Sequence, residues 1–321
     1  MRVVLHATSL WVPVGSDDDQ LHLRRMGDPG GPTALAVHGA VENGRIFYSG
    51  SGRGLAPFLA RRGWDLWVLD LRGRGLSRPR VGRHSTWGQT EIIVEDLAAA
   101  AEAVAAARGR LPEAWLCHSW GGVLVASHLV RFAAPREAAA AVAHFGVKRR
   151  IRARHLRRLL PIELNWKRLG PLVTRAAGYL PARRFGWGAD DESRGTHRDS
   201  VAWVREDGPW VDPGDGFDYG SAAHEARLPP TLWLAGAADH VLGNPADVRL
   251  FMAECRQPEG PLWLLARDAG FRHDYGHVDM LTHPDADADH FPKVAGWLEE
   301  QVGDQGPRPP GGQGTGVRAA G

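Results

Sequence analysis

The sequence contains few cysteines and no long apolar run. Its 321 residues include two cysteines, Cys117 and Cys255, which lie far apart in the chain. Two such thiols make no disulfide framework, so we expect a reducing, cytoplasmic compartment. No stretch approaches the roughly 18 uninterrupted apolar residues that a membrane span requires. The apolar start of the chain is interrupted by His6, Ser9 and Pro13, which is not typical of a signal peptide and indicates a first strand instead.

A large excess of one charge is also missing. The formal net charge is +2, with 24% charged and 43% hydrophobic residues, which is the composition of an ordinary globular protein. This balance argues neither for nor against nucleic-acid binding, and we expect no nucleic-acid partner. The length suffices for one large α/β domain or for a core with a smaller insertion.

Short apolar runs alternate with segments of helical periodicity. The first two runs, 2–14 and 20–26, predict an antiparallel pair of strands. Further strands are predicted at 33–39, 64–73, 113–119, 139–147, 231–237 and 261–268. Helices are predicted at 53–63, 91–108, 121–133 and 288–302. This alternation indicates an α/β fold with a mostly parallel central sheet and helices on both faces.

One long connection interrupts the pattern. The predicted strands that end near Val147 and begin at Thr231 are about 80 residues apart, whereas βα loops usually have 2 to 6 residues. We therefore expect residues 148–230 to form an inserted helical lid, or cap, on a core made of 1–147 and 231–302. The Gly/Pro-rich tail, 303–321, is predicted to be disordered.

The lid begins with a basic run, "KRRIRARHLRR", over residues 148–158. Such a run is usually a solvated face. Its interleaved leucines also allow an amphipathic helix on a membrane surface. Both interpretations stay open, and membrane contact is the weaker of the two.

Ser119 lies in "WLCHSWGG", between a predicted strand and a predicted helix. This is the context of a nucleophile elbow, in which small residues relieve a strained turn. Gly121 and Gly122 provide small residues downstream, but Cys117 occupies a position where the G-x-S-x-G pattern has glycine. A buried cysteine behaves as a small hydrophobe, so we expect it to be tolerated. Strand alternation places Cys117 and His118 on opposite faces, which argues against a Cys–His catalytic pair.

A serine nucleophile needs a base, an acid that orients the base, and donors for the developing oxyanion. His277 follows the last predicted strand, and Asp239 follows another strand at the edge where α/β sheets gather catalytic groups. His273, His240 and His283 compete locally with His277. The backbone amides of Ala40 and Trp120 are the candidate oxyanion donors.

Five motifs together resemble the α/β-hydrolase fold family. They are "HGAVENGRIFY", "LDLRGRGLS", "CHSWGG", "GAADHVLG" and "YGHVDML", and the last is similar to that of lipase and esterase members. The order Ser119, Asp239, His277 is also that of this fold. The resemblance spans residues 33–298, with the lid region outside it because lids vary in this family. It implies a Ser–His–Asp mechanism without a metal or an organic cofactor, and a lid that shapes the acyl or alcohol pocket, but it does not specify the substrate. We expect a serine hydrolase that acts on a small-molecule carboxylic ester.

The resemblance does not decide the reaction. Amide or peptide hydrolysis, carbon–carbon bond hydrolysis, acyl transfer and cofactor-free lyase chemistry use the same triad. A ligand-binding module without catalysis is a further alternative. The oligomeric state is not predicted.

Several other residues are candidates for the pocket or its support. Asp70, Arg72 and Ser77 form a charged turn that is expected to support the site rather than touch substrate. The possible pocket residues are Glu42, Asn43, Trp166, Trp187, Trp203 and Trp210. The tryptophans either pack in the lid or form a platform that favours an apolar or ring-bearing substrate.

Overall fold

The computed structural model describes residues 6–15, 18–152, 166 and 168–303. Its main feature is an eight-stranded sheet with the order β1-β2-β4-β3-β5-β6-β9-β10. The strands are β1 (Ala7–Pro13), β2 (Gln20–Gly27), β3 (Thr33–Val37), β4 (Asp65–Asp70), β5 (Ala114–His118), β6 (Ala141–Phe145), β9 (Thr231–Gly236) and β10 (Leu262–Leu265). β2 pairs antiparallel with β1 and with β4, and all other neighbours are parallel. The predicted α/β fold with a mostly parallel sheet is confirmed.

The central strands are buried along their whole length. Every residue of β3, β4, β5, β6 and β9 is buried. A parallel sheet covered on both faces requires strands that are apolar throughout, which is why these short runs were recognisable in the sequence. Each of these five central strands is shorter than the predicted run, because the last residues of the run already form the loop that leaves the sheet.

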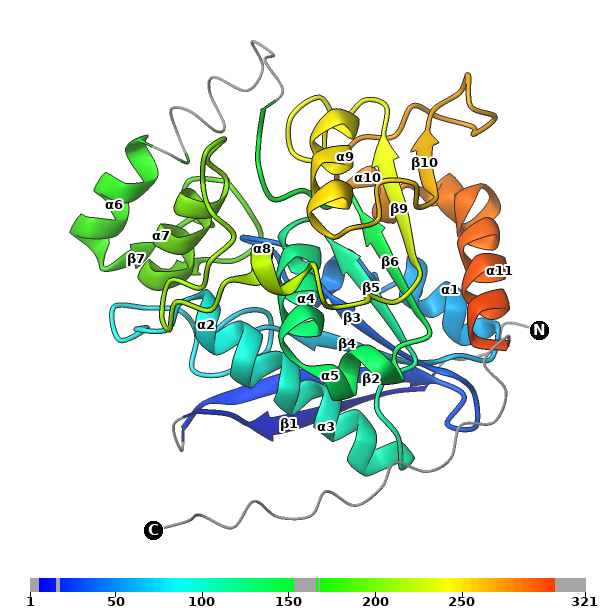
Figure 1. The fold of residues 1–321 in the computed structure, drawn as a ribbon. Helices are drawn as coiled ribbons and strands as arrows, with labels where there is room; N and C mark the ends of the chain where they lie inside the picture. Colours follow the sequence, from blue (N-terminus) through cyan, green and yellow to red (C-terminus); the bar gives the residue numbers. More distant parts are fainter. Residues whose placement is uncertain (1–5, 16–17, 153–165, 167, 304–321) are drawn as a thin grey trace.

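Helices cover both faces of the sheet (Figure 1). The helices of the core are α1 (Leu55–Arg61), α2 (Gln89–Glu91), α3 (Leu97–Arg108), α4 (Trp120–Arg131), α5 (Ala133–Ala138), α9 (Pro245–Glu254), α10 (Asp279–Thr282) and α11 (His290–Gly303). Residues of α3, α4 and α9 share one hydrophobic cluster, and residues of α1 and α11 share the other. The predicted helix 91–108 comprises α2, a π-helical turn (Ile92–Asp96) and α3. Short 3₁₀ turns at Gly44–Ile46 and Pro284–Ala288 complete the core.

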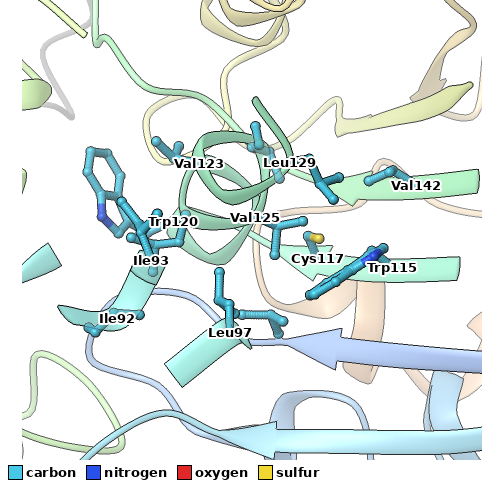
Figure 2. Packing of buried hydrophobic residues seen from close by; sticks show 14 of the residues in the cluster. Ile92, Ile93, Leu97, Trp115, Cys117, Trp120, Val123, Val125, Leu129 and Val142 are labelled. Carbon is cyan, nitrogen blue, oxygen red and sulfur yellow. The ribbon is translucent and has the colours of Figure 1, made fainter. Parts of the chain in front are cut away.

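Cys117 belongs to the hydrophobic core. Its side chain is fully buried on β5, and Figure 2 shows it with Trp115 opposite Val125 of α4. Burial raises the pKa of the thiol well above its ordinary value. The residue therefore packs as the small hydrophobe that the sequence predicts.

The segment 148–230 adds smaller elements to this core. They are α6 (Gly170–Ala177), β7 (Tyr179–Leu180), β8 (Glu192–Ser193), α7 (Arg194–Trp203) and α8 (Tyr219–Ala222), with β7 and β8 forming a separate antiparallel pair. In Figure 1, α6 and α7 lie to one side of the main sheet, away from β10 and α11. Most of the basic run 148–158 and all but the first residue of the tail 303–321 lie outside the described residues. Within the described part of the chain, no helix is both long and apolar enough to cross a bilayer.

Asp70 is the centre of a buried polar network at the end of β4. Its carboxylate accepts hydrogen bonds from the Gly44 amide at 2.7 Å and the Leu76 amide at 3.0 Å, and it lies 2.8 Å from His22 Nδ1. Burial opposes ionisation of Asp70, but the hydrogen bond with His22 prevails and its pKa lies below the ordinary value. The Ser77 hydroxyl donates to the Asp70 carbonyl at 2.6 Å.

Arg72 anchors the same turn from the other side. Its guanidinium lies 2.8 Å from Asp96 and 2.6 Å from Glu95. The turn at the end of β4 is thus ion-paired, as the sequence indicates.

We expect Asp70→Ala to destabilise the protein by about 3 kcal/mol, because it leaves several buried donors without an acceptor. Chemical denaturation monitored by circular dichroism measures this change. Asp207→Ala is the matched control, since Asp207 is an exposed partner of Arg205 and its loss should have little effect on stability. Equal stability of the two variants would contradict a supporting role for Asp70.

Candidate active site

Ser119 occupies a strained turn between β5 and α4. Its φ of 51° lies in the left-handed region, which costs a non-glycine residue about 1 to 3 kcal/mol. The turn is held by a hydrogen bond from the Ser119 amide to the Phe145 carbonyl at 2.9 Å. A Cβ atom on Gly121 would overlap the His38 carbonyl, and one on Gly122 would overlap Val147. The two glycines therefore let α4 start directly behind the serine.

The structure brings Ser119, His277 and Asp239 into one hydrogen-bonded chain. His277 Nε2 lies 2.8 Å from Ser119 Oγ, and His277 Nδ1 lies 2.6 Å from Asp239 Oδ2. Ser119 follows β5 and Asp239 follows β9, so the parallel sheet delivers both to one edge. The Leu242 amide donates to Asp239 Oδ1 at 2.9 Å, which fixes the carboxylate.

Burial controls the charge state of this chain. It lowers the pKa of His277 below the ordinary value, although Asp239 acts in the opposite direction. Burial alone would raise the pKa of Asp239, but its hydrogen bond and charge interaction with His277 lower it. At neutral pH the geometry therefore holds a neutral imidazole between a hydroxyl and a carboxylate. Such an imidazole can accept the serine proton.

The loop after β3 carries Ala40 beside the serine. The flanking amides donate to carboxylates, Gly39 to Glu42 at 2.9 Å and Val41 to Glu192 at 2.7 Å. The Ala40 amide makes no hydrogen bond with any residue that the structure describes. Trp120 is the first residue of α4, where an amide has no acceptor within its own helix. Both residues line the cavity that contains Ser119.

Buried His118 and half-buried Glu42 form a pair next to His277. His118 Nδ1 lies 2.8 Å from the Glu42 carboxylate, and its Nε2 lies 3.0 Å from the His277 carbonyl oxygen. Because both partners are acceptors, both ring nitrogens must donate, so His118 is an imidazolium. Burial opposes this charge, but Glu42 raises the pKa of His118.

Burial alone would raise the pKa of Glu42, but the charge and the hydrogen bond of His118 lower it to about 2. The rings of His118 and His277 are 4.7 Å apart. Sequence analysis did not identify His118 as a site residue, although its position immediately before Ser119 was a signal. Through His118 Nε2, the pair holds the backbone carbonyl of His277.

A cavity of about 670 Å³ opens above Ser119. Glu42, Asn43, Trp166 and Trp187 line it, as expected. Most of the other lining side chains are apolar, including those of Ile46, Ile151, Leu242 and Val278.

The expectation that Trp203 and Trp210 face this cavity is corrected. Both belong to the hydrophobic core and are almost fully buried. Trp203 Nε1 donates to the Val211 carbonyl at 2.8 Å, and Trp210 Nε1 donates to Ser127 Oγ at 3.0 Å. Each indole satisfies its N–H inside the protein, so neither presents a face to a ligand.

The chain matches a known protein family. A family model described as serine aminopeptidase, S33, matches residues 33–194, which is just over half of the chain. The chain belongs to this family. The resemblance to α/β hydrolases seen in the sequence is thereby confirmed. No curated protein matches this chain.

Solved structures of other α/β hydrolases share the fold of this S33 member. A putative aryl esterase from Burkholderia cenocepacia has 18% identity and a TM-score of 0.59, with 92% of this chain and 100% of the other covered. A thermophilic esterase from Thermogutta terrifontis has 15% identity and a TM-score of 0.58, with 92% and 99% covered. A haloalkane dehalogenase from Bradyrhizobium elkani has 17% identity and a TM-score of 0.57, with 94% and 100% covered. At these identities the similarity establishes the fold alone.

The competing histidines have other surroundings in the S33 chain. His273 Nε2 lies 2.7 Å from Asp285 Oδ2, and the Asp285 amide donates to His283 Nδ1 at 3.1 Å. The ligand atoms of these three residues lie within 4.8 Å of one another and could hold a metal ion. The Ser119 hydroxyl is hydrogen-bonded to His277 Nε2 instead, so this cluster is separate from the serine.

We expect Glu42→Gln to destabilise the protein at pH 7 by about 3 kcal/mol, because it removes the charge partner of buried His118. The pKa of Glu42 is about 2 in the folded protein and 4.5 ordinarily, so its stabilising contribution is complete above pH 4.5 and is lost as the pH falls toward 2. The stability difference between wild type and variant should shrink in that window.

Urea denaturation at a series of pH values measures this difference. Glu225→Gln is the control, because Glu225 is exposed and should give a small difference at every pH. A wild-type advantage that stays constant from pH 6 to the acid limit would contradict the assignment of the buried charge pair.

Proposed function

We propose that the protein is a serine hydrolase that cleaves carboxylic esters, with Ser119 as nucleophile, His277 as base and Asp239 as orienting acid. The observation that carries this proposal is the hydrogen-bonded chain of 2.8 Å and 2.6 Å between these side chains, beneath a largely apolar cavity. Nucleophile and base at this separation, with the base held by a third group, are the signature of an activated serine.

In the proposed reaction, His277 Nε2 takes the Ser119 proton as Oγ attacks the ester carbonyl carbon. The Ala40 and Trp120 amides stabilise the oxyanion, and the His277 imidazolium returns the proton to the leaving alcohol. A water molecule, activated by the same histidine, then attacks the acyl-enzyme and releases the acid. Asp239 holds the imidazole tautomer and stabilises the imidazolium.

The cavity supports a small-molecule substrate with apolar or aromatic parts. Trp166 and Trp187 contribute to its wall from the segment 148–230, which is consistent with a cap over the serine. We place the enzyme in the cytoplasm, because Cys117 and Cys255 are free and buried thiols that need no oxidising compartment.

Amide or peptide hydrolysis is the second candidate, because the family model is described as a serine aminopeptidase. An aminopeptidase binds the ammonium group of a peptide N-terminus and needs a free acceptor for it. Among the described lining residues, Glu42 is the carboxylate available, and it already binds His118 and the Gly39 amide. Esters are therefore favoured, and p-nitroanilide analogues of the best ester distinguish the two reactions.

We expect Ser119→Ala to reduce p-nitrophenyl ester hydrolysis by more than about a thousandfold, because the nucleophile is lost. A fluorophosphonate probe should label the wild type at Ser119 and leave the variant unlabelled. Ser221→Ala is the control, since Ser221 is an exposed residue of α8. Full activity of a folded Ser119→Ala protein would refute the mechanism.

The pH profile of kcat/KM should have an acid limb with a midpoint below about 6.5, the ordinary pKa of histidine. Burial lowers the pKa of His277, and only the neutral ring can act as base, so activity is lost as the pH falls through this lowered value. Initial rates followed at the isosbestic wavelength of nitrophenol give the profile. A limb centred above 6.5 would exclude His277, in this environment, as the titrating base.

A further inference from the structure

Lys148 is a buried cation in the wall of the cavity that contains Ser119. It follows β6 in the chain, exposes 5% of its surface and lines the same cavity as Ser119 and His277. Its ammonium nitrogen lies 6.0 Å from the centre of the Trp120 ring. Lys148 thus approaches the reaction centre from the strand between those that carry Ser119 and Asp239.

The ammonium group has no ion-pair partner among the described residues. The acids whose charges reach it are Asp239, Asp247 and Glu42, and each has another partner. Asp239 binds His277 at 2.6 Å, Asp247 accepts from the Arg152 amide at 2.9 Å, and Glu42 binds His118 at 2.8 Å.

An unpaired ammonium in a largely apolar wall is unfavourable. Burial accordingly lowers the pKa of Lys148. An anion bound in the cavity would provide a partner for the Lys148 ammonium group. A charge-assisted hydrogen bond of this kind is about twice as strong as a neutral one.

The charges along the cavity favour an anionic ligand over a cationic one. Arg45, which is exposed, and Lys148 are the lysine and arginine side chains that line it within the described chain. The lining carboxylate, Glu42, is neutralised by His118. A ligand therefore meets a net positive cavity with a cation at the surface and another in the wall.

We infer that the substrate is an ester that carries a carboxylate, which pairs with Lys148 while Ser119 attacks the ester carbonyl. This inference rests on the proposed function. The carbon chain between the two groups would lie along the apolar wall that includes Trp120 and Ile151. The carboxylate can belong to the acyl part or to the alcohol part of the ester.

Two isosteric substrate pairs test the inference and separate these sources. The acyl pair is the p-nitrophenyl monoester of adipic acid, which carries a free carboxylate, and p-nitrophenyl 5-carbamoylpentanoate, in which a neutral amide replaces that carboxylate. The alcohol pair is 3-carboxyphenyl butyrate and 3-carbamoylphenyl butyrate. In at least one pair, the wild type should have a kcat/KM at least tenfold higher for the carboxylate, and that pair identifies the source.

Lys148→Met keeps the length of the side chain without its charge and should abolish this preference, so that kcat/KM becomes equal for the carboxylate ester and the neutral ester of the pair. Lys148→Arg should restore part of the preference. Lys293→Met is the matched control, because Lys293 is exposed on α11, and it should change neither rate. The same melting temperature for all variants, or a higher one for Lys148→Met, would exclude unfolding as the cause.

A preference that is absent in both pairs, or that survives Lys148→Met, would overturn the inference. Failure of the proposed function has a different signature, namely that Ser119→Ala remains active or that no ester is turned over. In that case calorimetry tests the anion site without the reaction. The adipamate anion, which has one carboxylate and one amide, should still bind the wild type at least tenfold more tightly than neutral adipamide. It should lose this advantage in Lys148→Met. Equal binding of the two compounds would count against the anion site itself.

Discussion

The parallel pairing of β3, β5, β6 and β9 is the constraint on which the site depends. Parallel neighbours end at the same edge of a sheet, and the loops that follow them therefore converge. Ala40 follows β3, Ser119 follows β5, Lys148 follows β6 and Asp239 follows β9. Burial on both faces fixes the register of these strands, because a slip of one residue would exchange the side chains that face the two hydrophobic clusters. The same buried strands therefore form the apolar core and bring the catalytic residues together at one edge of the sheet.

The carboxylates of half-buried Glu42 and buried Glu192 hold the loop after β3, which has an unusual backbone. Val41 has a φ of 51°, which a β-branched residue adopts only under restraint. Glu42 binds the Gly39 amide and Glu192 binds the Val41 amide. Each carboxylate has its own cation, since Glu42 pairs with His118 and Glu192 pairs with Arg74 at 2.6 Å. Arg74 also donates to the Gly39 carbonyl at 3.2 Å, so the loop is held on both sides and Ala40 is left to face the serine.

Sequence patterns predicted the parts of the molecule that depend on local periodicity or on strand ends. The buried strands were visible as short apolar runs, and the positions of Ser119, Asp239 and His277 followed from the strands before them. α9 was not predicted, although Asn244 caps it and Pro245 begins it, a combination typical of a helix start. Its buried apolar residues Val248, Phe251 and Met252 also follow helical spacing.

Contacts between distant residues were not predictable in the same way. His118 and Glu42 are 76 positions apart, and nothing local to either indicates that they form a buried ion pair. The sequence around Trp203 and Trp210 has no apolar period from which the direction of an indole could be inferred. Lys148 appeared as the first residue of a basic run, and only the fold separates this buried residue from exposed Arg152.

The position of Lys148 links substrate recognition to the strength of the base. Its positive charge contributes to lowering the pKa of Asp239, and the same charge disfavours a second cation nearby. When His277 takes the serine proton, it becomes an imidazolium in a buried site that already contains the cation His118 at a ring distance of 4.7 Å. An anion paired with Lys148 would offset one of these positive charges at the step where another develops. A carboxylate-bearing ester would therefore gain in the transition state as well as in binding, whereas a neutral ester would leave Lys148 without an anionic partner as His277 becomes charged.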